Sequence, residues 1–169
     1  MKRLFILLTF VLSALSLSAQ KQEWRTIDAG ICLLEDSYVT FTSGTQYNDK
    51  FYCGFGSGLE YTYTIQIDIS DPNLSKPDNV NVGGLVFPVF VDGKYRFFDT
   101  WCSPSFRLRA GALLSASVLG VGGFIRPELG IDFSRHFTIS MGWNWQKVYT
   151  KYGWYSMSAS PLICLSVKF

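Results

Sequence analysis

The sequence has no apolar run as long as the ~20 residues that a membrane-spanning helix needs. Beyond the N-terminal segment, one of its longest uncharged stretches extends from Ala110 to Ile125. Gly120, Gly122 and Gly123 lie within this stretch and disfavour a helix interior. No long segment shows the period of an amphipathic helix either. We therefore interpret the stretch as two β-strands joined by a turn rather than as a membrane helix.

Residues that bind metals or activate nucleophiles are also few. His136 is the only histidine, and the four cysteines contain no CxxC pair and match no zinc-binding spacing. Asp68, Asp71 and Asp78 share one predicted loop, but their spacing is not that of an EF-hand. The sequence therefore predicts no metal site and no cofactor.

The N-terminal segment has the layout of a secretory signal peptide. Two basic residues precede an apolar run from Leu4 to Leu12, and small residues follow up to Ala19. The run is too short for a membrane anchor, so we expect cleavage after residue 19. Removing 1–19 leaves 13 basic and 13 acidic residues, a balance that gives no reason to expect a nucleic-acid partner. The remaining residues, 20–169, suit one domain.

From residue 24 onward the dominant period is two, which is typical of β-strands. The sequence predicts eight strands, at about 24–34, 37–47, 50–63, 84–97, 103–116, 121–134, 136–149 and 156–169. Each is long enough to cross a bilayer as a tilted strand of ~9–11 residues. We expect the short connections at 47–50 and 134–136 to be periplasmic turns, and 64–83 to be an external loop. Both termini of the domain then lie on the periplasmic side.

The two faces of these strands differ in chemistry. In 121–134, for example, Ile125, Leu129 and Ile131 alternate with Arg126 and Glu128. The apolar face is rich in large aromatic rings, and the interior of an eight-stranded barrel is too narrow to hold them all. The apolar face must then point outward into lipid. The predicted fold is all-β: a closed eight-stranded antiparallel up-and-down transmembrane β-barrel in a bacterial outer membrane.

Aromatic residues also gather towards the ends of the predicted strands, as in the girdles of transmembrane barrels. One predicted membrane interface contains Phe97, Phe133 and Phe169. The other contains Tyr61, Tyr63, Trp143 and Trp145.

The inward face carries charges of both signs, which must pair when they are buried. The predicted charge network of the lumen consists of Glu60, Asp92, Lys94, Arg96, Arg107, Arg109, Arg126, Glu128 and Asp132, with Asp28 and Lys168 on the same face. Counting back from the turns places Asp92, Arg107, Arg109 and Glu128 in one ladder across three strands. We interpret the network as a plug of ion pairs, and a polar conduit or proton path is the alternative.

Three glycines alternate on one of the predicted strands. Gly54, Gly56 and Gly58 are not followed by a helix, so they do not predict a phosphate-binding loop. We expect them to make room for long charged side chains.

Cys32 and Cys164 lie on the inward faces of the first and last strands, which become neighbours on closure. An oxidising compartment would allow a disulfide between them, provided that their Cα atoms lie within about 7 Å.

The last ten residues, 160–169, alternate apolar positions and end in Phe169. They resemble the C-terminal signal by which outer-membrane barrels are recognised for assembly. Residues 47–59 and 87–92 resemble those of small porin-like barrels of the OmpA/OmpX type, especially the Bacteroidetes versions. The resemblance covers the mature chain and implies two partners, outer-membrane lipids and the barrel-assembly machinery. It leaves the external ligand open.

The sequence thus favours a non-enzymatic outer-membrane barrel with a structural or surface-interaction role. A narrow channel for ions or small solutes is one alternative, and a soluble, exported lipid-binding barrel is another. A lipid-modifying enzyme is a third, because His136 has Asp132 and Ser134 nearby. We interpret His136 as a turn residue instead, since residues 132 and 134 extend along one strand rather than converging on it.

Overall fold

The structure, a computed structural model, describes residues 22–33, 36–48, 50–62, 66–69, 78–81, 84–116, 120–133, 136–149 and 155–169. Its strands are β1 (Gln22–Cys32), β2 (Asp36–Gln46), β3 (Phe51–Thr62), β4 (Gln66–Ile69), β5 (Asp78–Asn81), β6 (Gly84–Arg96), β7 (Cys102–Ser115), β8 (Gly120–Phe133), β9 (Phe137–Tyr149) and β10 (Tyr155–Lys168). In these residues no helix is long and apolar enough to cross a membrane.

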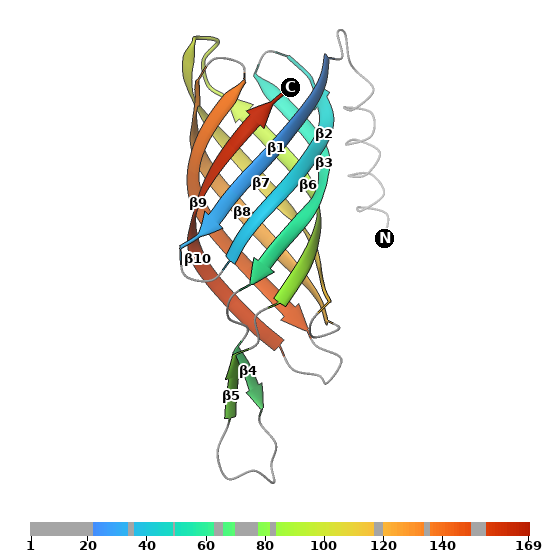
Figure 1. Cartoon of the computed structure of the whole chain (residues 1–169). Coiled ribbons are helices and arrows are strands. Elements are labelled where there is room, and N and C mark those ends of the chain that lie inside the picture. The colour runs from blue at the N-terminus through green and yellow to red at the C-terminus, as the bar shows by residue number, and fades with distance from the viewer. Residues whose placement is uncertain are drawn as a thin grey trace, which may run out of the picture.

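Eight of the strands close into one antiparallel barrel, in the order β1-β10-β9-β8-β7-β6-β3-β2 (Figure 1). The closing contact is the pairing of β1 with β10, in which Thr26 lies opposite Lys168 and Cys32 opposite Leu162. The predicted strands agree with the observed ones to within two residues at every end. The predicted closed eight-stranded barrel is therefore confirmed.

Between β3 and β6 the chain forms a feature that the sequence analysis did not predict. Strands β4 and β5 pair antiparallel as a separate two-stranded sheet, with Gln66 opposite Asn81. This hairpin projects beyond one end of the barrel (Figure 1). Each strand has four residues, which is too short for alternation to separate a strand from a loop. We call the end of the barrel that carries this hairpin the loop end. The opposite end, where the chain passes from β2 to β3 and from β6 to β7, is the turn end.

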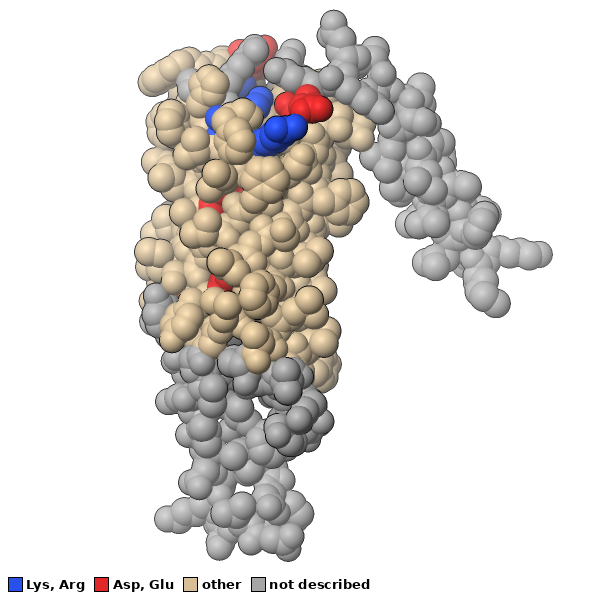
Figure 2. All heavy atoms as spheres, turned by 45° about the vertical axis from the view of Figure 1, so that its right-hand side comes forward, with Lys and Arg blue, Asp and Glu red and all other residues tan. Residues whose placement is uncertain are grey.

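The outer wall of the barrel is apolar. Phe55 and Trp101 are each 74% exposed and Met141 is 66% exposed, and exposed aliphatic or aromatic side chains occur on all eight barrel strands. On the face shown in Figure 2 the wall is almost free of charge apart from two small acidic spots, and most of the visible Lys, Arg, Asp and Glu atoms lie at the upper rim, which is the turn end. An apolar surface of this extent is far larger than the patches that soluble monomers expose.

Among the described residues, four aromatic rings are nevertheless buried inside the barrel, and they correct the expectation about the glycines. The ring of Tyr38 lies over Gly30, and the ring of Phe90 lies over Gly56, so close that a Cβ at either glycine would overlap it. The hydroxyl of Tyr52 approaches Gly54 in the same way, and Phe124 is the fourth buried ring. Gly58 lies against the backbone of the neighbouring strand. These glycines make room for rings and backbone, rather than for charged side chains.

Candidate functional site

Three arginines enter the lumen from neighbouring strands. Arg107 and Arg109 come from β7, and Arg126 comes from β8. Their exposed fractions are 4%, 0% and 0%. Burying a guanidinium is costly unless it is both paired and hydrogen-bonded, so the partners of each arginine determine whether the lumen is stable.

Arg107 joins opposite sides of the barrel. Its Nη1 donates to Asp28 Oδ1 on β1 at 2.8 Å and to Ser166 Oγ on β10 at 3.0 Å. Its Nε donates to Asp92 Oδ1 on β6 at 2.9 Å, and its Nη2 contacts both carboxylates. One side chain therefore holds two carboxylates and spans the lumen.

Arg109 forms a second set of contacts with another carboxylate. Its Nε donates to Glu128 Oε1 at 2.8 Å, and its Nη2 pairs with the same oxygen and donates to the Tyr38 hydroxyl at 2.9 Å. The other oxygen of Glu128 accepts a hydrogen bond from Ser140 Oγ at 2.6 Å. Arg109 Nη1 also lies 3.7 Å from Asp28 Oδ2, which links this set to that of Arg107.

Arg126 forms the third set, which extends towards the loop end. Its Nη2 donates to Glu60 Oε2 at 2.5 Å, and its Nε donates to Asn144 Oδ1 at 2.8 Å. Its guanidinium carbon lies 4.6 Å from the ring centroid of Tyr38 and 4.5 Å from that of Phe124. Aromatic faces attract a cation at these distances, so rings as well as carboxylates stabilise this arginine.

The remaining charges of the predicted network lie at the turn end. Lys94 Nζ is 2.8 Å from Asp132 Oδ1 and donates to Thr138 Oγ1 at 2.7 Å. Arg96 Nε is 3.6 Å from Asp132 Oδ2, and Arg96 Nη1 is 3.8 Å from Asp99 Oδ1. The structure thus places all nine residues of the predicted network inside the barrel or at its mouth, each in an ion pair.

The ladder of four residues shows how the pairs form. In the pairing of the strands, Asp92 lies opposite Arg109, and Arg107 lies opposite Glu128. The shortest ion pairs are instead diagonal: Arg107 with Asp92, and Arg109 with Glu128. Diagonal neighbours are separated by ~7–8 Å between backbones, a distance that a long arginine side chain can bridge.

Sequence analysis missed several members of this site. Asp28 was placed on the inward face, but its central position between Arg107 and Arg109 was not foreseen. Asp36 is fully buried and accepts a hydrogen bond from Gln146 Nε2 at 3.0 Å, and Tyr38 contacts two arginines. The parity of the strands was an available signal, because Asp36 and Tyr38 alternate with the outward-facing Val39 and Phe41 of β2.

The comparisons with known proteins bear on the fold alone. No family model and no curated protein matches the sequence. The crystal structure of Neisserial surface protein A (NspA) superposes with a TM-score of 0.50 at 10% sequence identity, over 88% of this chain and 96% of that chain. This chain has the fold of a small outer-membrane β-barrel. The N-terminal β-barrel domain of Pseudomonas aeruginosa OprF has a TM-score of 0.43 at 13% identity, over 89% and 100% of the two chains.

The predicted interface aromatics of the barrel occupy different depths. Tyr61, Phe97 and Phe169 are exposed and lie at or beyond strand ends, and Phe133 ends β8 and packs against Trp101 with ring centroids 6.4 Å apart. Tyr63 lies outside the described residues.

The two tryptophans of β9 lie on the outer wall, away from the first residue of the strand. Trp143 and Trp145 are exposed on the outer wall, with ring centroids 6.4 Å apart. Trp143 stands at the midpoint of β9 rather than near its end. The strand extends six residues beyond Trp143 at the loop end, and an interfacial position for this residue stays a prediction.

The disulfide that an oxidising compartment would allow between Cys32 and Cys164 is absent from the structure. All four cysteines are free in the structure. Cys32 lies opposite Leu162, and Cys164 lies opposite Gly30, so the two cysteines are diagonal neighbours. Backbones in that relation are ~7–8 Å apart, beyond the usual reach of a disulfide. The two thiols instead pack with Tyr38 and Leu162 in a buried apolar cluster.

The thiols should differ sharply in their reactivity towards a water-soluble maleimide. Cys102 is exposed at the start of β7, whereas Cys32 and Cys164 are buried. In the folded, detergent-solubilised protein we expect Cys102 to react within minutes, and Cys32 and Cys164 to react only after unfolding. Mass spectrometry of labelled peptides measures this. Rapid labelling of Cys164 without denaturant would show that the seam between β1 and β10 opens.

The structure places His136 and Asp132 in different surroundings. His136 is exposed in a turn, and its Nδ1 lies 3.4 Å from the backbone oxygen of Lys168. The carboxylate of Asp132 points into the lumen, where it accepts hydrogen bonds from Ser105 and Thr138 and pairs with Lys94. Residue 134 lies outside the described residues.

Proposed function

We propose that the protein is a non-enzymatic, integral outer-membrane barrel whose lumen is closed by ion pairs, and that it has a structural or surface-interaction role. In this proposal residues 1–19 are a cleaved export signal, and the C-terminal strand β10 is recognised by the barrel-assembly machinery. The turn end then faces the periplasm, and the loop end faces the outside, where it meets a ligand.

The observation that carries the proposal is the contrast between the two faces of the wall. Outside, the exposed side chains are apolar, as expected of a surface that contacts lipid rather than water. Inside, two of the buried arginines are tied to carboxylates across the lumen, Arg107 to Asp28 and Arg126 to Glu60. Side chains that bridge the lumen in this way occupy the space through which a solute would pass.

The same contrast disfavours a soluble, lipid-binding barrel, because such a protein presents its apolar face to an internal cavity. Here the internal apolar cluster of Val86, Phe90, Leu113, Phe124 and Val148 is buried and packed, on one side of the lumen. A narrow channel remains the main alternative, since polar side chains line the lumen from one end to the other.

Planar bilayer recording separates the plug from the channel. In salt of about 1 M, we expect purified full-length protein to insert into the bilayer without giving reproducible conductance steps. A porin in the same bilayer should give clear steps. Salt at that concentration screens exposed charges but penetrates little to buried pairs, so it should not open the lumen. Insertion is verified in parallel by the altered gel mobility of the unheated protein.

A paired variant tests the role of the network in closure. Arg126→Ser with Glu60→Ser removes both partners of one pair and leaves no stranded charge. The pairs of Arg107 and Arg109 remain, so we expect this variant to stay silent as well. Reproducible steps from the unmodified protein, lost when a lumen residue is enlarged, would refute the plug and favour the channel.

A further inference from the structure

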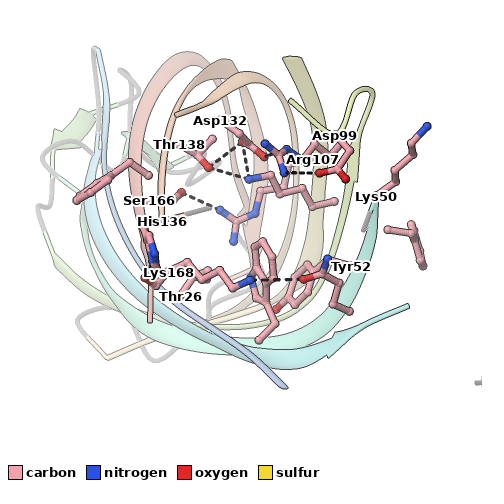
Figure 3. Close-up of a pocket in the computed structure, with 16 residues that line it drawn as sticks. Thr26, Lys50, Tyr52, Asp99, Arg107, Asp132, His136, Thr138, Ser166 and Lys168 are labelled. Atoms are coloured by element: carbon pink, nitrogen blue, oxygen red, sulfur yellow. Dashed lines mark hydrogen bonds and ion pairs between the residues drawn. The ribbon is translucent and has the colours of Figure 1, made fainter. Parts of the chain in front are cut away.

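The cations inside the barrel at the turn end already have partners (Figure 3). Lys94 pairs with Asp132, and Arg96 contacts the same carboxylate. Lys168 Nζ donates to Gln46 Oε1 at 3.4 Å. These contacts keep the charges of the interior occupied, and the surface that remains for a partner is the outer wall.

One sector of the outer wall carries hydroxyl groups. Ser43 on β2 and Ser57 on β3 are exposed, and Ser37 and Thr45 on β2 are half-buried. All four have outward parity. Among the described residues of the eight barrel strands, Ser and Thr with outward parity occur on β2 and β3 alone. The wall is therefore least apolar in this sector.

Hydroxyls in the middle of the wall lack hydrogen-bond partners. Ser57 is the seventh of the twelve residues of β3, so it lies far from both ends of the strand. Neither Ser43 nor Ser57 makes a side-chain hydrogen bond among the residues that the structure describes. Hydrocarbon offers a hydroxyl no partner, whereas a second protein surface can supply one.

Next to these hydroxyls the wall has a projecting ring and a shallow place. Phe55 is 74% exposed. Two residues before it on β3, Cys53 lies opposite Gly93 of β6. A Cβ at Gly93 would meet a single atom within 4 Å, the backbone oxygen of Leu108 at 4.0 Å. The wall is therefore open beside the ring, and we call the surface of Ser43, Cys53, Phe55, Ser57 and Gly93 the hydroxyl patch.

The hydroxyl patch is complementary to itself. Figure 1 places β2, β3 and β6 on the right of the barrel, the side that Figure 2 turns towards the viewer. The outward-facing residues of these three strands include no charged side chain, so two copies can approach without repulsion. A hydroxyl both donates and accepts, and identical hydroxyls can therefore pair across an interface.

We propose that two copies of this chain associate in the membrane through the hydroxyl patch. The Phe55 ring of each copy packs over the shallow place beside Gly93 of the other copy. Ser43 and Ser57 form hydrogen bonds across the interface. Such an interface is two-fold symmetric, and small and hydroxyl-bearing residues are the ones that pack protein surfaces together within a bilayer. The dimer rests on the proposed location of the barrel in a membrane.

Energy transfer between copies in lipid vesicles tests the dimer. Water-soluble donor and acceptor maleimides, added together after insertion, label Cys102, which is exposed at the start of β7. We expect transfer above the random level that falls on dilution with lipid, as for a monomer–dimer equilibrium. The variant Ser43→Ala with Ser57→Ala should weaken association about tenfold, because each lost hydroxyl occurs twice in a symmetric dimer.

Two further variants test the shape of the patch. Phe55→Ala removes the projecting ring, and Gly93→Val fills the shallow place, so we expect each to weaken association at least several-fold. Met141→Ala is the matched control, because Met141 is 66% exposed on β9, four strands from β3 in either direction around the barrel. This control should associate as the unmodified protein does. The gel mobility of unheated samples verifies that each variant is folded.

The outcomes separate the dimer from the membrane barrel itself. Inserted protein without transfer above the random level would overturn the dimer and leave the barrel in place. Equal weakening by Met141→Ala and by the double serine variant would also overturn it, because association would then not depend on the hydroxyl patch. Failure of the protein to insert into vesicles would count against the membrane location and the dimer together.

Discussion

Replacing Glu128 with Gln should lower the free energy of unfolding by about 3–5 kcal/mol, because it strands a buried guanidinium. Arg109 is fully buried, and Glu128 is its closest carboxylate. The neutral amide of Gln keeps the shape of the side chain, so the loss reports charge rather than packing. Urea unfolding of the protein in detergent or lipid vesicles, followed by tryptophan fluorescence, measures the change.

The double variant Glu128→Gln with Arg109→Gln should recover part of this loss, since it leaves neither charge unpaired. Coupling between the two sites would then be at least ~1 kcal/mol, as expected of residues in one network. Additive effects in this double-mutant cycle would show that the two side chains do not act as a pair. Recovery should be incomplete, because Arg109 also bonds to Tyr38 and lies near Asp28.

Glu23→Gln serves as the matched control for this experiment. Glu23 pairs with Arg25 at 3.0 Å, but both side chains are largely exposed. Exposed pairs contribute little to stability, so this variant should unfold at the same denaturant concentration as the unmodified protein. A similar loss in Glu23→Gln and Glu128→Gln would indicate an effect of overall charge rather than of burial.

The fold could be predicted from the sequence because the period of two fixes which face of each strand meets lipid. In β9, for instance, Phe137, Ile139 and Met141 point outward, whereas Thr138 and Ser140 point inward, as their parity indicates. A shift of one residue would exchange the two faces, so the pattern also fixes the register closely. The hairpin of β4 and β5 was missed because strands of four residues carry too little of that pattern.

The lumen was predictable in composition but not in connectivity. Parity placed Arg107 and Arg126 inside, but it could not show that Asp28 reaches Arg107 across the barrel, 79 residues away in sequence. Contacts across a lumen depend on the stagger of the strands and on side-chain length, neither of which alternation reveals. The buried rings of Tyr38 and Phe90 were not predicted, although both residues have inward parity.

The apolar exterior leads to the second prediction, which tests the membrane assignment itself. Met141 lies on the outer wall within the central part of β9, opposite Leu129 and Ile163, both of which are also exposed. Met141→Arg should lower stability in lipid vesicles by about 2–4 kcal/mol, the usual cost of a lipid-facing arginine near the bilayer midplane. Unfolding and refolding in vesicles measures the difference.

Phe137→Arg is the control for depth, because Phe137 is equally outward-facing but begins β9 at the turn end. An arginine there reaches the headgroups, and its cost should be only about 0–1 kcal/mol. The difference between the two variants, rather than either value alone, identifies a hydrocarbon layer around the middle of the barrel. Equal and small effects of Met141→Arg and Phe137→Arg would mean that the wall meets water, and the assignment to a membrane would then be wrong.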